Sequence, residues 1–367
     1  MIYDIAIVGG GLTGSLTARS LAARGRSVLL LEARPLGHTE GSSHGTSRIF
    51  RRAHPVPIYA DMASRAQHLW RKLEDDSGVA LLTTTGGLDY GIDRHPRELY
   101  EAVRANAVTC ELLSAAAAEE RFPGMRFPTD VLFQPDAGHI NPNATIAAAL
   151  AVAETDGADI RIGTAVEAVE HRFGNVSVAT SDGTFTARHL VVAAGPWLPE
   201  ILSRTLPDIP DPHLTVTEQN IFHFTETMAP GHWPVLICMH HRTFYGLPSG
   251  ADGGPEPALK VGRHDPGVAT TPASRSGLPD PHTRDLVQSF VDTWLPGLAS
   301  TPVREDTCLY TNTRNEDFLL DRRGPITVAS PCSGQGAKFA PVVGEMISDI
   351  ALGLSKTPDR FALSAHL

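Results

Sequence analysis

The chain has 367 residues, a length that suits two domains or one domain with a large insertion. Its hydrophobic content of 42% and charged content of 20% are typical of a globular protein. The net charge of −10 argues against nucleic acid or an anionic membrane as the main partner, because either would repel most of the surface.

The cysteines and the first residues indicate the cellular setting. The cysteines lie far apart and form no Cys-x-x-Cys motif: Cys110, Cys238, Cys308 and Cys332. This spacing favours neither a metal site nor a disulfide framework. The first residues enter an apolar strand without a signal-peptide pattern, and no apolar run reaches membrane-spanning length. We therefore expect a cytoplasmic protein with no metal and no membrane partner.

The first predicted unit is Ile5–Glu32, where an apolar run leads into Gly9-x-Gly11-x-x-Gly14, a helical segment and a second apolar run. Gly9 permits a tight turn, Gly11 lets the backbone approach a pyrophosphate, and Gly14 lets helix and sheet pack closely. The unpaired N–H groups that begin the helix attract phosphate. Glu32 ends the second strand, where it can bind ribose hydroxyls. The order predicts a βαβ unit for a dinucleotide, either NAD or FAD.

The next segment, residues 35–57, is rich in Gly, Ser, His and Arg. Five of the eleven residues from 44 to 54 can carry positive charge: His44, Arg48, Arg51, Arg52 and His54. A solvated surface loop is one interpretation. Ile49 and Phe50 stand between the arginines, however, and they favour a partly buried loop whose backbone wraps a ligand.

Residues 58–140 mix helical and strand patterns and do not continue the nucleotide unit, so we assign most of them to a second domain. The predicted helices are Ile58–Ser77, Pro96–Ala107 and Ala115–Arg121, and the predicted strands are Leu81–Gly91 and Val131–Ile140.

Residues 141–195 return the chain to the nucleotide sheet. An Asn-Pro-Asn cap begins a predicted helix over Ala144–Glu154. Strands are predicted over Ile160–Ile162, Ala165–Arg172, Val176–Ser181 and Thr184–Arg188, with an Asp-Gly hairpin turn before the last. Leu190–Ala194 is predicted to be a buried strand, and Gly195 after it allows close approach to a cofactor.

The last part of the chain contains a second sheet. Thr215–Phe224 alternates apolar and polar residues, as in a half-buried strand. Further strands are predicted over Val235–Met239, Thr243–Leu247, Ala258–Val261, Val303–Leu309, Phe318–Asp321 and Ile326–Ala329, and helices over Arg284–Leu295 and within Gly336–Leu354. The Gly/Pro-rich loops Ser249–Pro255 and Pro266–Pro281 can cover a pocket.

Six motifs occur in order along the chain. They are Ser43-His44-Gly45-x-x-Arg48-Ile-x-Arg51, Ala194-Gly195-Pro196-Trp197, Tyr245-Gly-Leu-Pro-Ser249, Leu259-Lys260-Val-Gly-Arg-His264, Thr307-Cys308-Leu-Tyr310 and Ser333-Gly-Gln-Gly-Ala-Lys338-Phe339. Together they resemble the monomeric sarcosine oxidase and N-methyl amino acid oxidase family of D-amino-acid-oxidase-like flavoproteins. The resemblance spans nearly the whole chain and is more specific than the glycine pattern.

The resemblance implies a two-domain α/β flavoprotein. A doubly wound, Rossmann-like FAD-binding domain would comprise residues 1–80, 141–213 and 305–367. An α+β substrate domain with a mixed, largely antiparallel sheet would comprise residues 81–140 and 214–304. The resemblance also implies FAD attached covalently through the Cys308 sulfur, although a buried core cysteine is the simpler interpretation of a lone cysteine.

Family residues that bind the substrate carboxylate match Arg51 and Lys338, and Arg48 matches one close to the flavin. An arginine offers a carboxylate a bidentate fork. Lys338 is predicted at a helix start, where the dipole disfavours a cation unless an anion is near. Lys260 matches the lysine that activates oxygen near flavin N5, where a cation stabilises the developing negative charge.

Other pocket and cofactor residues follow from the same resemblance. His264 is a catalytic candidate, and His54, Tyr245 and Tyr310 are substrate-pocket candidates, with structural histidines and core aromatic residues as the alternatives. The cofactor candidates besides those already named are Arg34, His44, Gly195, Gly334 and Gly336.

The expected reaction is oxidation of a secondary amino acid, an N-methyl amino acid or an N-substituted glycine, by hydride transfer to FAD, with O2 reduced to H2O2. The chain departs from the family at Thr46-Ser47, at His54, at Thr313-Arg314-Asn315 and in the lengthened Tyr245–Lys260 segment. These departures favour a substrate larger than sarcosine. Alternatives are cleavage of a larger N-substituted glycine to glyoxylate and an amine, a flavin dehydrogenase of a cyclic imino acid, an NAD-dependent dehydrogenase and a non-catalytic flavin-binding subunit. We expect a monomer.

Overall fold

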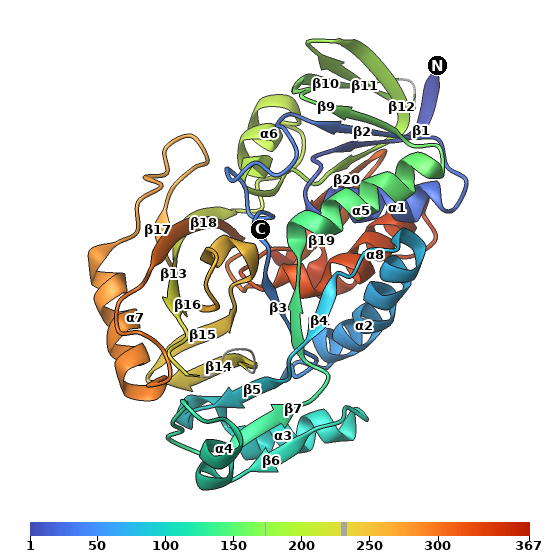
Figure 1. Cartoon of the computed structure of the whole chain (residues 1–367). Coiled ribbons are helices and arrows are strands. Elements are labelled where there is room, and N and C mark those ends of the chain that lie inside the picture. Colours follow the sequence, from blue (N-terminus) through green and yellow to red (C-terminus); the bar gives the residue numbers. More distant parts are fainter. Residues whose placement is uncertain (173, 229–232) are drawn as a thin grey trace.

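The computed structural model describes residues 1–172, 174–228 and 233–367 (Figure 1). The strands form two large sheets, and a small sheet of three strands lies between them. No described helix is long and apolar enough to cross a membrane. All four cysteines are free thiols.

The first sheet contains the predicted nucleotide unit. Helix α1 (Leu12–Ala22) joins β1 (Ile2–Val8) to β2 (Val28–Glu32), and β1 lies parallel to both β2 and β12. The strand order is β10-β11-β12-β1-β2-β9, with β20 beside β12 and β19 beside β20. The other strands are β9 (Asp159–Ile162), β10 (Val166–Arg172), β11 (Asn175–Thr180), β12 (Gly183–Val192), β19 (Leu319–Arg323) and β20 (Ile326–Ser330).

Strand β12 confirms that the chain returns to the nucleotide sheet. The prediction of two separate strands over Thr184–Arg188 and Leu190–Ala194 is wrong, because they form one strand. Its first half pairs antiparallel with β11, and its second half lies parallel to β1 and β20. His189, which lies between the two predicted strands, is buried and forms a 2.8 Å hydrogen bond through Nε2 with Thr327 Oγ1. The strand continues because this partner satisfies the buried ring.

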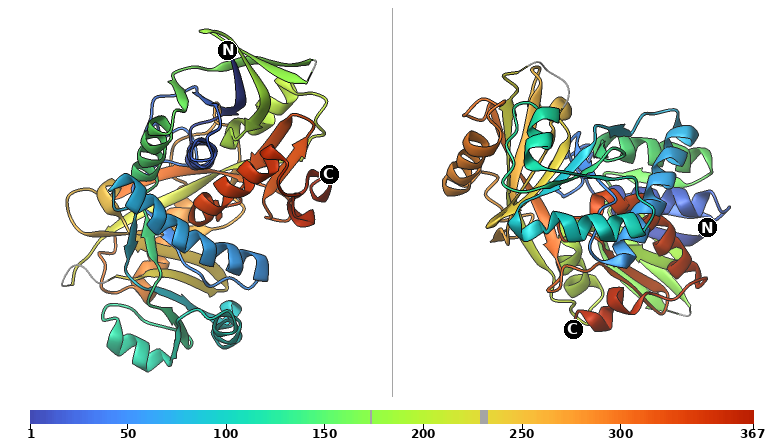
Figure 2. Two further views of the ribbon diagram at one scale, coloured as in Figure 1. Left: turned by 90° about the vertical axis from the view of Figure 1, so that its right-hand side faces the viewer. Right: turned by 90° about the horizontal axis from the view of Figure 1, so that it is seen from below.

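Helices cover both faces of the first sheet, as a doubly wound fold requires. Ile5 and Ile7 of β1 pack toward α1, α2 (Pro57–Ser77), α5 (Pro142–Thr155) and α8 (Ala340–Leu352). Ala6 and Val8 point to the opposite face, which α6 (Leu198–Thr205) covers, because side chains alternate along a strand. Figure 2 shows α2, α5 and α8 on one side of the molecule.

The second sheet is mixed and largely antiparallel, as predicted. Its order is β17-β13-β16-β15-β14-β5-β7-β6, with β18 beside β13, and β5 and β14 form its parallel pair. The strands are β5 (Gly87–Tyr90), β6 (Glu111–Leu113), β7 (Val131–Gln134), β13 (Thr215–Thr225), β14 (Val235–His240), β15 (Arg242–Pro248), β16 (Ala258–His264), β17 (Val268–Ala269) and β18 (Arg304–Asn312). The helices beside it are α3 (Pro96–Ala105), α4 (Ala115–Arg121) and α7 (Pro281–Trp294).

Strand β13 is buried on both faces rather than half-buried. Phe222 and Phe224 lie in the same core cluster as residues of α7. On the opposite face, Gln219 and His223 are nearly inaccessible although they are polar. The alternation therefore marks two different covered faces, because the polar face of β13 is turned toward the interior of the molecule.

The third sheet joins the basic loop, residues 44–54, to one end of each of the two predicted strands Leu81–Gly91 and Val131–Ile140. It pairs β8 (Gly138–Ile140) with β3 (Arg48–Phe50) and with β4 (Leu82–Thr84). Each predicted long strand is therefore two strands, because its ends belong to different sheets.

The remaining short elements are 3₁₀ turns. They are η1 (Ile92–Arg94), η2 (Gly195–Trp197), η3 (Gly250–Gly253), η4 (Gly336–Phe339), η5 (Asp359–Phe361) and η6 (Leu363–Ala365). The division into domains stays a prediction. Strand β18, which the predicted boundary places with the FAD-binding segments, pairs with β13 of the second sheet.

Candidate active site

Two adjoining cavities lie where the sheets approach each other. One of about 550 Å³ is lined by the glycine loop after β1, and the other of about 630 Å³ is lined by the basic loop and the second sheet. They share the lining residues Thr13, Ser42, Ser43, Ala193 and Gly195. The first cavity lies at the carboxyl end of β1, where a doubly wound sheet binds its ligand.

The glycine loop has the geometry that its pattern predicts. Gly9 has φ +103°, and a Cβ atom there would lie 2.5 Å from the Ala193 carbonyl oxygen. A Cβ on Gly14 would lie 1.8 Å from the Gly9 carbonyl oxygen. Gly11 precedes α1 without a side-chain cap, and the Leu12 N–H donates to Ser43 Oγ at 3.2 Å. The first turn of α1 therefore meets the cavity through backbone, as phosphate binding requires.

Glu32 lies at the end of β2 in the same cavity. Its Oε2 accepts a 2.6 Å hydrogen bond from the Gly10 N–H, and its Oε1 accepts one of 2.7 Å from the Arg34 N–H. Each oxygen keeps a further lone pair for a ribose hydroxyl. The Arg34 side chain pairs with Glu40 at 3.1 Å. Gly195 has φ +52° and open space where a side chain would stand, so a ligand can approach its backbone closely.

The basic loop carries buried polar atoms that have no hydrogen-bond partner among the described residues: Ser42 Oγ, His44 Nε2 and Arg48 Nη2. Burial and the neighbouring Arg48 lower the pKa of His44 to about 3, so this ring is neutral. Unsatisfied polar atoms at this depth are costly unless a ligand pairs with them. Their position along the shared border fits a long polar cofactor that extends through both cavities.

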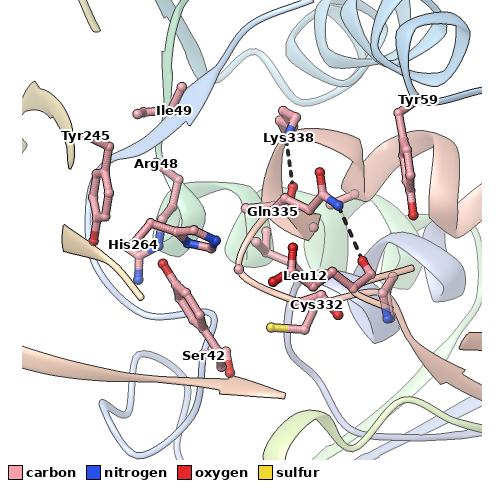
Figure 3. A pocket seen from close by; sticks show the side chains of 18 of the residues that line it. Leu12, Ser42, Arg48, Ile49, Tyr59, Tyr245, His264, Cys332, Gln335 and Lys338 are labelled. Atoms are coloured by element: carbon pink, nitrogen blue, oxygen red, sulfur yellow. Dashed lines mark hydrogen bonds between the residues drawn. The ribbon is translucent and has the colours of Figure 1, made fainter. Parts of the chain in front are cut away.

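Figure 3 shows the second cavity, with Tyr245, Arg48 and His264 close together and Lys338 and Gln335 beyond them. Lys260 also lines this cavity and is nearly inaccessible. Its Nζ donates to Asp252 Oδ2 at 2.7 Å and to the Ser47 carbonyl oxygen at 3.3 Å.

Asp252 belongs to the Gly/Pro-rich segment that was expected to cover a pocket. Its Oδ1 accepts a 2.9 Å hydrogen bond from the Thr46 N–H, so it ties η3 to the basic loop as well as to Lys260. Burial and Arg48 lower the pKa of Lys260 to about 8, while Asp252 opposes this change. The protonation of Lys260 is therefore sensitive near neutral pH.

Arg51 and Lys338 both line the same cavity, and Arg51 is near enough to affect the pKa of Lys338. Arg51 Nη1 lies 3.4 Å from Asp89 Oδ1 and donates to the Ala53 carbonyl oxygen. Lys338 Nζ donates to the Gln335 carbonyl oxygen at 3.1 Å and lies 4.4 Å from the Phe339 ring centroid. Burial lowers the pKa of Arg51 to about 10, and burial with Arg51 nearby lowers the pKa of Lys338 well below its usual value. An anion beside them would stabilise the charged forms of both side chains and raise both pKa values.

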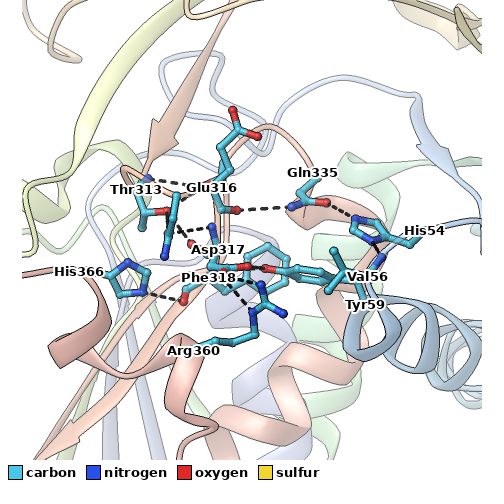
Figure 4. Close-up of polar contacts among 12 residues, drawn as sticks. His54, Val56, Tyr59, Thr313, Glu316, Asp317, Phe318, Gln335, Arg360 and His366 are labelled. Atoms are coloured by element: carbon cyan, nitrogen blue, oxygen red, sulfur yellow. Dashed lines mark hydrogen bonds and ion pairs between the residues drawn. The ribbon is translucent and has the colours of Figure 1, made fainter. Parts of the chain in front are cut away.

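His54 is held by a hydrogen-bond network (Figure 4). Its Nδ1 accepts a 3.1 Å hydrogen bond from the Val56 N–H, so Nε2 carries the proton and donates to Gln335 Oε1 at 3.1 Å. Burial, with Lys338 and Arg51 nearby, lowers the pKa of His54 to about 3. Neighbouring Tyr59 donates to Asp317 Oδ1 at 2.9 Å. His54 is thus a fixed neutral group rather than an acid–base catalyst at neutral pH.

The remaining candidates line the same cavity: Tyr245, His264, Cys308 and Tyr310. Cys308 is buried on β18, and burial raises the pKa of its thiol. The glycines after β20 shape this wall, because a Cβ on Gly334 would lie 2.6 Å from the Tyr310 ring and one on Gly336 would lie 1.7 Å from the Pro331 carbonyl oxygen. No cluster of side chains suited to a metal ion occurs in the part of the chain that the structure describes.

Comparison with known proteins gives the family. A family model described as FAD dependent oxidoreductase (DAO) matches residues 4–350. The chain belongs to this family. It is 32% identical to the peroxisomal sarcosine oxidase of Homo sapiens, over 98% of this chain and 94% of that protein. It is also 32% identical to the monomeric sarcosine oxidase of Streptomyces avermitilis, over 95% of this chain and 94% of that protein. The solved structure of NikD, described as an unusual amino acid oxidase essential for nikkomycin biosynthesis, has a TM-score of 0.86 at 26% identity and covers 98% of this chain and 97% of its own.

This FAD-dependent oxidoreductase has cavities that suit its cofactor. The glycine loop, Glu32 and the N-terminus of α1 would hold the adenosine and pyrophosphate, and the unpartnered atoms of the basic loop lie on the path toward the second cavity. The flavin would then lie within reach of residues from both large sheets. The fit rests on this geometry together with the family match.

Sequence reasoning missed the acidic partners of the predicted cations and one further arginine. Asp89 and Arg94 follow β4 in a segment without any motif, and Asp252 lies in a loop interpreted only as a cover. Asp89 pairs with nearby Arg94 and with the more distant Arg51. Asp252 pairs with Lys260 eight residues later and accepts from the Thr46 N–H, 206 residues earlier. Gln335 was part of a quoted motif, but its contact with His54 spans 281 residues.

Proposed function

We propose that this flavoprotein oxidises the C–N bond of a secondary amino acid. The observation that carries the proposal is a pair of cations, the largely buried Arg51 and the buried Lys338, in a cavity that continues into a dinucleotide site. Two buried cations with one carboxylate neighbour suit a substrate carboxylate, which would be held beside the cofactor. The names of the sarcosine oxidase relatives support the same class of substrate.

The bound FAD would supply the redox chemistry by accepting a hydride equivalent and passing two electrons to O2. In balance, the secondary amine and O2 give an imine and H2O2, and water then converts the imine into a primary amine and a carbonyl compound. Arg51 and Lys338 bind and orient the carboxylate. Tyr245 and Tyr310 line the same cavity and would exclude water, and no residue is needed to remove a carbon-bound proton.

Lys260 and Cys308 act on the cofactor side of the cavity. We propose that Lys260 supplies the positive charge that favours electron transfer to oxygen. We also propose that the Cys308 sulfur forms the covalent bond to the flavin, supported by its position in the cavity wall. A Cys308 that only fills the core would still line the cavity, so the covalent bond needs a direct test.

The substrate is an N-methyl amino acid or an N-substituted glycine. The first would give formaldehyde and a primary amino acid, and the second, oxidised at its glycine carbon, would give glyoxylate and an amine. We propose that the protein acts as a monomer.

The decisive experiment combines two measurements on the purified protein. Acid denaturation should leave yellow flavin with the chain, and peroxide should form when N-alkyl glycines and N-methyl amino acids are added. Flavin that separates from the chain would contradict the covalent bond alone. Bound flavin without peroxide from any secondary amino acid would contradict the proposed activity.

A further inference from the structure

The substrate cavity contains a third buried cation, Arg94, which none of the proposed roles uses. It ends η1, and 8% of its side chain is exposed. It lines the same cavity as Arg51 and Lys338. The cavity wall beside it also includes Ile237 and Met239 of β14. Arg94 thus presents charge to a wall that is otherwise partly apolar.

One carboxylate, Asp89, serves both arginines. Arg94 Nε donates to Asp89 Oδ1 at 2.7 Å, and Arg94 Nη2 lies 2.6 Å from the same oxygen without a hydrogen bond. Arg51 Nη1 lies 3.4 Å from that oxygen as well. Asp89 Oδ2 accepts a 3.1 Å hydrogen bond from Gln134 Nε2. Both oxygens of Asp89 are therefore engaged, and the carboxylate cannot satisfy every donor around it.

The unsatisfied donors of Arg94 point to a ligand. Among the residues that the structure describes, its Nη1 has only the Met239 sulfur as a hydrogen-bond partner, at 3.9 Å, and a thioether is a weak acceptor. Nη2 is buried and makes no hydrogen bond among the described residues. A guanidinium has five N–H donors, and leaving several of them unpaired in the interior is costly.

The charges around this part of the cavity do not balance. Arg51, Arg94 and Lys338 face one carboxylate, Asp89, which leaves an excess of two positive charges when all three cations are protonated. The other acidic groups of the cavity lie elsewhere: Asp317 pairs with Arg360 at 3.0 Å, and Glu316 is exposed. One substrate carboxylate would offset half of this excess.

We propose that the substrate carries a second carboxylate, which Arg94 binds while Arg51 and Lys338 bind the first. The substrate class is a dicarboxylic secondary amino acid, with the second carboxylate either on the side chain or on the nitrogen substituent. Because both arginines contact the same oxygen of Asp89, the two substrate carboxylates are separated by only a few bonds. This inference rests on the proposed function, since it assigns the substrate of the same site.

Binding of non-oxidisable analogues tests the inference separately from activity. (Methylthio)acetate and thiodiacetate have sulfur in place of the amine and differ by one carboxylate. Their dissociation constants for the holoenzyme can be measured by calorimetry and by changes in flavin absorption. We expect thiodiacetate to bind at least about tenfold more tightly, as a charge-assisted hydrogen bond predicts. Equal affinities in the wild-type protein would overturn the inference.

Variants distinguish a role of Arg94 in binding substrate from a role in positioning Arg51. The double variant Asp89→Asn, Arg94→Met removes one cation together with one anion and so keeps the net charge of the group, and it should lose the preference for thiodiacetate while weakening (methylthio)acetate binding far less. The control, Arg97→Met, removes an exposed arginine of α3 that pairs with Asp130 and should keep the preference. An equal loss of affinity for both analogues in the double variant would mean that the pair only positions Arg51.

Peroxide assays complete the test. N-methyl-L-aspartate, N-methyl-L-glutamate and iminodiacetate should have higher kcat/KM values than sarcosine. Oxidation of sarcosine with no gain from a second carboxylate would refute the inference and leave the proposed function intact. Tight, Arg94-dependent binding of thiodiacetate without oxidation of any amine would refute the proposed function and leave the second carboxylate site intact.

Discussion

Removing the charge of Asp252 tests the proposed role of Lys260 in the reaction with oxygen. Asparagine at position 252 keeps the shape of the side chain and the oxygen that accepts from the Thr46 N–H, but it removes the charge 2.7 Å from Lys260 Nζ. A hydrogen bond to a charged group is worth about 1.5–3 kcal/mol. The loss therefore lowers the pKa of Lys260 by about one to two pH units, from its wild-type value of about 8.

The direction in which the rate changes with pH follows from the requirement for a protonated Lys260. In its proposed role Lys260 favours electron transfer to oxygen only when it is protonated, so the rate in the wild-type protein should fall as the pH rises through about 8. In Asp252→Asn the fall should occur at lower pH. At pH 7.5 the protonated fraction, and with it the rate, should be between about threefold and about twenty-fivefold smaller.

The assay mixes anaerobically reduced enzyme with oxygenated buffer and follows flavin absorbance at each pH. Asp265→Asn is the matched control, because Asp265 pairs with Arg263 at 3.0 Å near the end of the same strand and does not contact Lys260. It should leave the midpoint unchanged. A midpoint that stays at the wild-type pH in Asp252→Asn would refute the reasoning. So would a faster reaction at every pH, since that would mean that the negative charge of Asp252 matters more than the proton on Lys260.

Three further predictions concern single residues. Cys308→Ala should release all flavin from the acid-denatured chain, and flavin that stays attached would place the covalent bond elsewhere. Lys338→Met should raise the dissociation constant of (methylthio)acetate about tenfold or more, because one of two carboxylate-binding cations is lost, and calorimetry can measure this. His54 has a pKa of about 3 and is neutral above pH 5, so the substrate affinity should show no titration attributable to it between pH 5 and 7, and the His54→Asn variant should have the same pH profile for binding.

The local parts of this structure could be predicted because each depends on residues close in sequence. The βαβ unit follows from the spacing of Gly9, Gly11 and Gly14, whose backbone requirements are met within one loop. The helices and most strands follow from periodicity. The division of Leu81–Gly91 and Val131–Ile140 into strands of different sheets could not be predicted, because it is decided by which distant strand each half meets.

The candidate cations were predicted, but the charges that control them were not. Lys260, Arg51 and Lys338 belong to motifs, and the structure brings all three to one cavity. Asp252 and Asp89 occur in segments with no motif, and their roles depend on contacts with Thr46 and with Gln134 that no spacing reveals. A family resemblance therefore identifies the chemistry of the site more readily than the electrostatics that adjust it.

Asp252 and Asp89 lie beside two regions of the cavity wall that differ in their charge. Asp252 pairs with Lys260 on the side where oxygen would react, and Arg48 lies close enough to lower the pKa of Lys260. Asp89 faces two arginines, with Lys338 nearby, and leaves positive charge on the side where the substrate would bind. A substrate anion is therefore attracted more strongly toward Arg51 than toward Lys260. This separation would let the protein hold a highly charged substrate without changing the protonation of the group that controls the oxygen reaction.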